Sequence, residues 1–200
     1  MESLTGNLLV ASSIVGDPVY SRGVCLVVHQ DDDGAIGVML NRPMQPGPAA
    51  FMKMLSNDDE APSNRLTSTV EPSSPPANPL GTVHFGGPLS GPVVAIHPLS
   101  QYAEAETGKG IYVAAQKQNL EDLVREQPCP YRLIVGHLGW ESGQLQAEID
   151  AGIWHPMPAT VDTVFRNAAE MWPALIGRAT SRSVARWIGV PDVIGAGELN

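Results

Sequence analysis

The sequence lacks any long apolar run. None of its segments reaches the about 18 consecutive apolar residues that a membrane-spanning helix needs. Residues 1–6 have neither the basic start nor the apolar stretch of a signal peptide. We therefore expect a soluble protein of the cytoplasm that has no membrane partner.

Cysteine and clustered histidine are also scarce. The 200 residues include 2 cysteines, too few for a disulfide framework or a structural zinc site. Cys25 lies in the apolar run of residues 24–28, which predicts a buried, unreactive thiol with a raised pKa. No two of the 5 histidines have the spacing of a local metal site. We therefore predict no metal and no other cofactor.

Basic residues are few relative to acidic ones. The 12 Lys and Arg oppose 21 Asp and Glu, which gives a formal net charge of -9. Such a chain repels nucleic-acid phosphates, and this disfavours direct DNA binding. Arg178, Arg182 and Arg186 recur every four residues and would share one helix face. That face is either a local basic surface or the solvated side of an amphipathic helix, and the overall charge favours the second.

Local catalytic motifs are missing. The sequence contains no G-x-S-x-G elbow, no Walker loop and no G-x-G-x-x-G fingerprint. The acidic run at residues 31–34 does not form a calcium loop, because His29 and Leu40 stand where an EF-hand needs Asp and Glu. Glu141 and Glu148 lie near a predicted helix and are expected to be solvated surface carboxylates. These gaps weigh against an enzyme, although they leave an undiscovered one open.

Short strands mixed with helices fill most of the chain. An Asp-Gly step within residues 31–34 separates two apolar runs, 24–28 and 36–40, and predicts a hairpin of central strands. Irregular alternation of strands and helices favours an α+β fold with one mixed, largely antiparallel sheet and helices packed on it. Further strands are expected at residues 8–11, 82–85, 93–97, 111–114 and 131–138, and helices at 49–55, 120–126, 142–149, 160–172 and 181–188.

The stretch of residues 56–79 is rich in proline, serine and asparagine. It has too little apolar surface to offset its ordering entropy. We therefore predict a mobile loop inside the domain, because strand patterns resume directly after it. The resulting organisation is a domain over residues 1–177, followed by a C-terminal helix and tail over residues 178–200.

Six residues at strand ends suggest a binding site. If three strand ends meet at one edge of the sheet, their loops converge beside the N-terminus of the predicted helix 142–149, which attracts anions. The predicted anion pocket is lined by Asn41, Arg42, Gly86, Gly87, Trp140 and Gln144. In the alternative interpretation, Trp140 is a core residue, Arg42 pairs with a carboxylate, and the two glycines only turn the chain.

Four motifs in order resemble a known family. They are GAIGVMLNRP at residues 34–43, FGGPL at 85–89, GHLGW at 136–140 and GQLQAEI at 143–149. Together they resemble the YqgE/AlgH family over roughly residues 4–177. His137 and Leu138 stand where that family commonly has Tyr and Ala. The resemblance implies a compact α+β fold with no established activity and no agreed catalytic residues, and one branch is labelled a transcriptional regulator.

Two classes of function remain open from the sequence. The first is a non-enzymatic regulatory or interaction protein that acts indirectly, through an unknown protein partner. The alternative is a small-molecule-binding protein, or an undiscovered enzyme, that takes a small anionic ligand at the six residues named above. A concave pocket that joins those segments would favour the alternative.

Overall fold

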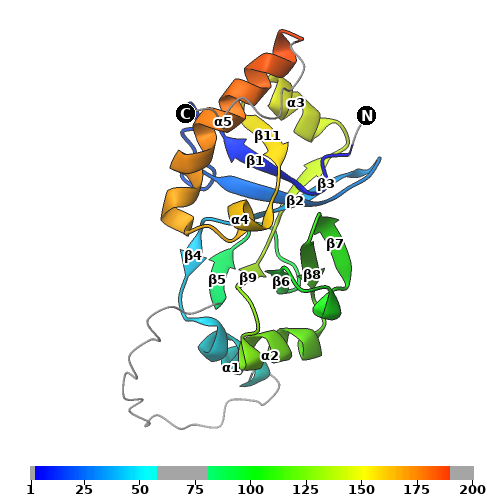
Figure 1. Ribbon diagram of the computed structural model, residues 1–200, viewed down its shortest axis with the longest axis vertical. Coiled ribbons are helices and arrows are strands. Elements are labelled where there is room, and N and C mark those ends of the chain that lie inside the picture. Colours follow the sequence, from blue (N-terminus) through cyan, green and yellow to red (C-terminus); the bar gives the residue numbers. More distant parts are fainter. Residues whose placement is uncertain (1–2, 58–80, 190–200) are drawn as a thin grey trace, which may run out of the picture.

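The computed structural model describes residues 3–57 and 81–189, and it contains two β-sheets (Figure 1). In sheet A the strand order is β10-β3-β2-β1-β11, and every neighbouring pair is antiparallel. Its strands are β1 (Asn7–Ala11), β2 (Val24–Gln30), β3 (Gly34–Met39), β10 (Leu138–Glu141) and β11 (Trp154–Pro158).

Sheet B has the strand order β4-β5-β9-β6-β8-β7 and is mixed, because β5 and β9 run parallel. Its strands are β4 (Pro43–Met44), β5 (Gly81–Phe85), β6 (Val94–His97), β7 (Ala105–Gly108), β8 (Ile111–Ala114) and β9 (Tyr131–Val135). The helices are α1 (Pro48–Asn57), α2 (Lys117–Glu126), α3 (Gln144–Asp150), α4 (Val161–Val164) and α5 (Ala168–Trp187), with a 3-10 turn η1 (Ser100–Tyr102).

The α+β class is confirmed, but the prediction of a single sheet is wrong. The chain passes from sheet A to sheet B after β3 and returns after β9. The strand predicted at residues 131–138 therefore ends earlier, at Val135 of β9, and Gly136 and His137 lead to β10, which begins at Leu138. Gly136 has a φ of 77°, and a Cβ there would lie 2.3 Å from the carbonyl oxygen of Gly87. This turn between the sheets consequently requires glycine.

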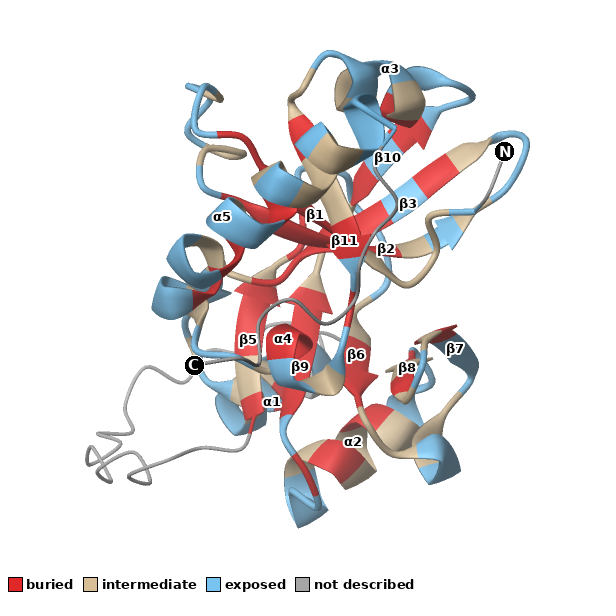
Figure 2. Ribbon diagram, turned by 45° about the horizontal axis from the view of Figure 1, so that its top comes forward, coloured by how far each residue is buried: buried red, intermediate tan, exposed pale blue. Residues whose placement is uncertain are grey.

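The predicted hairpin is confirmed as β2 and β3, and both faces of β2 are buried at its start. On one face Leu26 packs in a cluster with residues of sheet B and α5, while on the other Cys25 packs in a cluster that includes Leu145 of α3. Cys25 is fully buried, and burial raises the pKa of its thiol, as predicted. A third cluster lies between sheet B and the helices α1 and α2 (Figures 1 and 2).

Helix α3 differs from its prediction at its start. It begins at Gln144, because Gly143, with a φ of 76°, is the N-cap, and so Ser142 is not the capping residue that we predicted. Gly152 follows the end of α3 with a φ of 72°, which agrees with the predicted glycine stop. None of the helices in the described ranges combines the length and the hydropathy that crossing a bilayer demands.

The C-terminal helices also divide differently. The helix predicted at residues 160–172 is two helices, because Asn167 accepts a hydrogen bond from the Ala169 N–H and caps a new start. Thr160 caps α4, as predicted. α5 runs without a break across position 177, so no element boundary lies at that position. The loop predicted at residues 56–79 lies outside the described residues, except for its first two positions, which end α1.

A buried arginine connects the elements around the junction of the two sheets. Arg132 of β9 is only 5% exposed. Its guanidinium donates to the carbonyl oxygens of Val164 at 2.9 Å, Leu40 at 3.0 Å and Arg166 at 2.5 Å. It also lies 2.7 Å from Nε2 of His84. One side chain therefore holds β5, the link after β3, and the segment between α4 and α5.

His84 is neutral in this arrangement. Burial, and secondarily the nearby charge of Arg132, lower the pKa of His84 to about 3. Because Nε2 faces the Arg132 guanidinium, this nitrogen is the acceptor and the ring proton is assigned to Nδ1. The arginine thus keeps its charge among carbonyl oxygens and an imidazole, without a carboxylate among these partners.

Candidate functional site: an aromatic pocket beside helix α3

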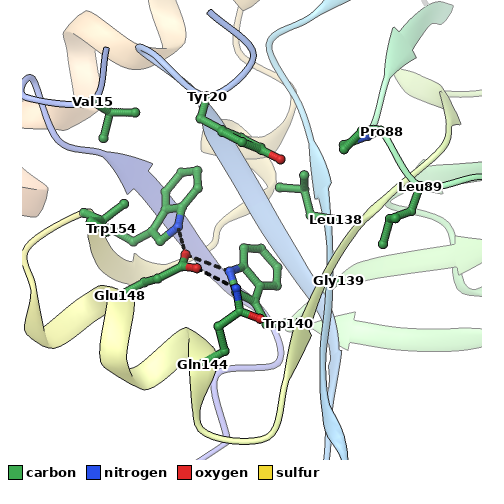
Figure 3. Close-up of a pocket in the computed structure, with 11 residues that line it drawn as sticks. Val15, Tyr20, Pro88, Leu89, Leu138, Gly139, Trp140, Gln144, Glu148 and Trp154 are labelled. Atoms are coloured by element: carbon green, nitrogen blue, oxygen red, sulfur yellow. Dashed lines mark hydrogen bonds between the residues drawn. The ribbon is translucent and has the colours of Figure 1, made fainter. Parts of the chain in front are cut away.

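A pocket lies on the α3 side of sheet A (Figure 3). Its volume of about 340 Å³ is near the lower end of the range for small-molecule sites. The walls come from β10, α3, the start of β11, and the loops that follow β1 and β5. The lining residues are Val15, Tyr20, Pro88, Leu89, Leu138, Gly139, Trp140, Gln144, Glu148, Ile153 and Trp154.

Strand β10 supplies one wall of the pocket. Leu138 and Trp140 are two residues apart on this strand, so their side chains point to the same face. Trp140 is 7% exposed and belongs to the core cluster under α3 as well as to the pocket wall. Its ring fits against β3 because Gly37 has no side chain: a Cβ there would lie 2.9 Å from the indole.

Two further aromatic rings face this wall. The ring centroids of Trp154 and Trp140 are 6.3 Å apart at an interplanar angle of 82°, and those of Trp154 and Tyr20 are 6.4 Å apart at 77°. Trp154 is therefore nearly perpendicular to both neighbours. The pKa of Tyr20 is raised, mainly by burial and further by the charges of Asp17 and Glu148.

Glu148 is held in place by three donors. Its Oε2 accepts the indole N–H groups of Trp140 and Trp154, each at 2.9 Å, and its Oε1 accepts the amide of Gln144 at 2.9 Å (Figure 3). Gln144 is itself oriented, because its Oε1 accepts the backbone N–H of Glu141 at 3.1 Å. The carboxylate is consequently fixed at one side of an apolar pocket by hydrogen bonds from three N–H donors.

The structure brings together two of the six residues that we predicted to form a site. Trp140 and Gln144 line the pocket. Gly86 and Gly87 lead directly into its lining residues Pro88 and Leu89, but do not line it themselves. Gly86 instead joins the strands through its backbone: its carbonyl accepts the Met39 N–H at 2.8 Å, and its N–H donates to Val135 O at 2.7 Å.

Asn41 and Arg42 serve a different place. The Asn41 side chain accepts the Val24 N–H at 3.0 Å and donates to Arg22 O at 2.8 Å. Arg42 donates to the carbonyl oxygens of Val19 and Ser21, and not to the carboxylate of our alternative interpretation. Both residues fasten the loop that carries Tyr20, and neither lines the pocket.

Sequence reasoning missed the other aromatic and charged residues of the pocket, Tyr20, Glu148 and Trp154. No strand was predicted at residues 154–158, whose two prolines break a strand pattern; β11 is an edge strand, where proline is tolerated, and it carries Trp154. Tyr20 lies in a loop without a pattern of its own. Glu148, which we expected to be a solvated surface carboxylate, is half-buried. The spacing Gln144 to Glu148 places both on one helix face and was the available signal.

The two-sheet α+β arrangement places the chain among folds of the AlgH type. The solution structure of the AlgH protein from Pseudomonas aeruginosa matches with a TM-score of 0.65 at 21% identity, covering 94% of this chain and 97% of that one. The crystal structure of protein DIP2367 from Corynebacterium diphtheriae matches with a TM-score of 0.64 at 20% identity, over 89% of this chain and 88% of that one.

Sequence comparison gives the family. The AlgH-like family model matches residues 8–183. A UPF0301 protein of Thermobifida fusca is 31% identical over 182 residues, which are 88% of this chain and 87% of that protein. A UPF0301 protein of Ruegeria pomeroyi is 30% identical over 179 residues, covering 86% and 90%. The chain belongs to the AlgH-like family, which confirms the resemblance. The names of these relatives state no activity and do not carry the transcriptional-regulator label.

Proposed function

We propose that this chain is a cytoplasmic, non-enzymatic small-molecule-binding protein whose site is the pocket beside α3. The observation that carries the proposal is Glu148, a carboxylate fixed by three N–H donors inside a pocket with aromatic walls. Ligand sites typically combine such apolar walls with a few fixed polar groups. Any regulatory role would follow from occupancy of this pocket and would reach its target indirectly, through a protein partner.

The chemistry of the lining residues supports binding over catalysis. Among the described residues that line the pocket there is no Ser, Thr, Cys, His or Lys, the side chains that most often act as nucleophiles or proton carriers. Glu148 is the carboxylate of the pocket, and both of its oxygens already accept hydrogen bonds. A group held in this way suits recognition of a ligand better than movement of protons.

A thermal-shift screen with a blocking variant tests this function. Val15 lines the pocket from a loop, so Val15→Trp should fill it without disturbing a strand. The adjacent Ile14 is 77% exposed and does not line the pocket, so Ile14→Trp is the matched control. Ligands of the pocket should raise Tm for the native protein and for Ile14→Trp, but not for Val15→Trp. Hits that shift all three proteins equally would contradict the proposal.

Protein–protein interaction is the second candidate function, favoured by the end of α5. Val184, Trp187 and Ile188 are exposed there, Trp187 to 83%. Exposed apolar clusters with a tryptophan are common at interaction sites. Trp187→Ser should abolish recovery of a protein partner, while Ile14→Ser, which removes an isolated exposed side chain, should leave it intact. Equal recovery with both variants would exclude this surface.

A further inference from the structure

We propose that the pocket binds a small alkylated ammonium cation, held between the aromatic rings and the carboxylate of Glu148. The inference names the ligand class of the site proposed above and therefore rests on that function. This cation differs from the anion that the sequence suggested. The anion site lined by all six residues remains a prediction.

The ring arrangement is the first support. Trp154 stands nearly perpendicular to Trp140 and to Tyr20, at 82° and 77°. Rings at right angles form adjacent walls of a box instead of a closed stack, and Figure 3 shows Leu138 on the side opposite Trp154. The faces of Trp and Tyr carry negative electrostatic potential, and they attract cations within about 6 Å of the ring. Such a box recognises alkylated ammonium groups, whose charge is spread over methyl surfaces.

The orientation of the indoles is the second support. Both indole N–H groups point at Oε2 of Glu148, so the positive edges of Trp140 and Trp154 are already occupied. A ligand in the pocket therefore meets ring surface and carboxylate, not free indole donors. Oε1 accepts a hydrogen bond from Gln144, and a carboxylate oxygen has two lone pairs. This leaves an acceptor for an O–H or N–H group that the ligand carries.

The charge around the pocket is the third support. No Lys, Arg or His is among the described residues that line it, so no basic side chain neutralises Glu148 there. A second hollow, of about 570 Å³, shares four residues with the pocket: Leu89, Gly139, Trp140 and Gln144. That hollow adds the acidic residues Asp31, Asp33 and Glu141, and its one histidine, His29, is already 3.0 Å from Asp31. This local field draws cations in and repels anions.

The size of the pocket limits the ligand. A volume of about 340 Å³ is near the lower end of the range for ligand pockets and suits a small molecule. Choline is therefore a suitable probe, since it carries a trimethylammonium group on a short chain. Its neutral isostere, 3,3-dimethylbutan-1-ol, has the same shape without the charge. A comparison of the two probes separates charge recognition from simple filling of an apolar space.

The experiment follows the indole N–H resonances of the intact protein by NMR during titration with choline, the isosteric alcohol, acetate and sulfate. The chain has 4 tryptophans. Choline should shift the resonances of Trp140 and Trp154 in a saturable way, leave Trp172 and Trp187 in place, and bind about tenfold more tightly than the alcohol. Equal binding of the alcohol would overturn the cation class while leaving the ligand-binding function standing.

Two other outcomes bear on the proposal. Saturable shifts of the same two resonances with acetate or sulfate in place of choline would overturn it in favour of the anion. No shift of Trp140 or Trp154 with any of the four probes would also overturn it, and the screen with Val15→Trp would then decide separately whether the pocket binds other molecules.

Charge variants give the matched control. Glu148→Gln keeps an oxygen acceptor for the indoles but removes the charge, and it should weaken choline binding about tenfold without changing the affinity for the alcohol. Glu141→Gln removes one charge from the neighbouring hollow without touching the pocket, and its effect should be smaller. A Glu148→Gln protein that binds choline as tightly as the native one would overturn the proposal. The comparison of choline with the alcohol needs no variant, so it holds even if Glu148→Gln misfolds.

Discussion

Replacement of Arg132 by methionine should destabilise the protein strongly. The side chain of methionine fills part of the space but donates no hydrogen bond, so the carbonyl oxygens of Val164, Leu40 and Arg166 lose this donor, while Nε2 of His84 keeps the Thr82 hydroxyl at 2.9 Å. Each unsatisfied buried polar group costs roughly 1–3 kcal/mol, which gives about 3 kcal/mol at the lower limit for the three carbonyl oxygens. That loss is a large part of the roughly 5–15 kcal/mol by which domains are stable.

Urea unfolding measures this loss, and Arg42→Met is its matched control. Arg42 also donates to carbonyl oxygens, those of Val19, Ser21 and Asn41, but it is only half-buried, so water can replace its bonds. We expect Arg42→Met to cost about 1 kcal/mol and the m-value to stay constant in both variants. An Arg132→Met protein no less stable than Arg42→Met would refute the view that this arginine holds the junction between the sheets.

Three further predictions concern pH, reactivity and the turn between the sheets. The pKa of His84 is about 3 in the folded protein and 6.5 ordinarily, so between these values the unfolded state binds one more proton than the folded state. The free energy of unfolding should therefore fall by roughly 1.4 kcal/mol for each pH unit from about pH 6 down to about pH 4. In His84→Gln the fall over the same range should be less steep. An equal slope in both proteins would contradict this. Cys25 should resist a thiol reagent in the folded state and react on unfolding, and Cys25→Ala should cost about 1 kcal/mol in urea unfolding; rapid labelling of the native protein would count against it. Gly136→Ala should lower Tm by more than Gly152→Ala. Both glycines have a positive φ, but only the Cβ of an alanine at position 136 would meet backbone, at 2.3 Å from the Gly87 oxygen. Equal losses of Tm would show that this close approach does not matter.

Local patterns predicted most strands and their burial, because apolar runs such as residues 24–28 have the same meaning in any fold. The number of sheets was not predictable in the same way. Apolar residues resume at Leu138, directly after Gly136 and His137, and the positive φ of Gly136 marks the point where the chain leaves one sheet for the other. The backbone conformation of Gly136 sends the chain from sheet B to sheet A, and the pattern of apolar residues does not indicate that conformation.

The pocket was only partly predictable for a related reason. Trp140 and Gln144 were found from their position after a strand and at the start of a helix. Trp154 reaches the same place from a proline-containing edge strand, and Tyr20 from a loop, so long-range packing alone brings them together. The positive charge proposed for the ligand rests on Glu148, whose burial follows from its contacts with the two indoles and not from its neighbours in sequence.

The location of a bound ligand tests the central claim most directly. A crystal structure of the protein soaked with choline should show the trimethylammonium group between Tyr20, Trp140 and Trp154, next to the Glu148 carboxylate, with the three hydrogen bonds to Glu148 unchanged. Choline bound elsewhere, for example in the hollow beside Trp187, with the pocket beside α3 holding only water, would contradict the claim.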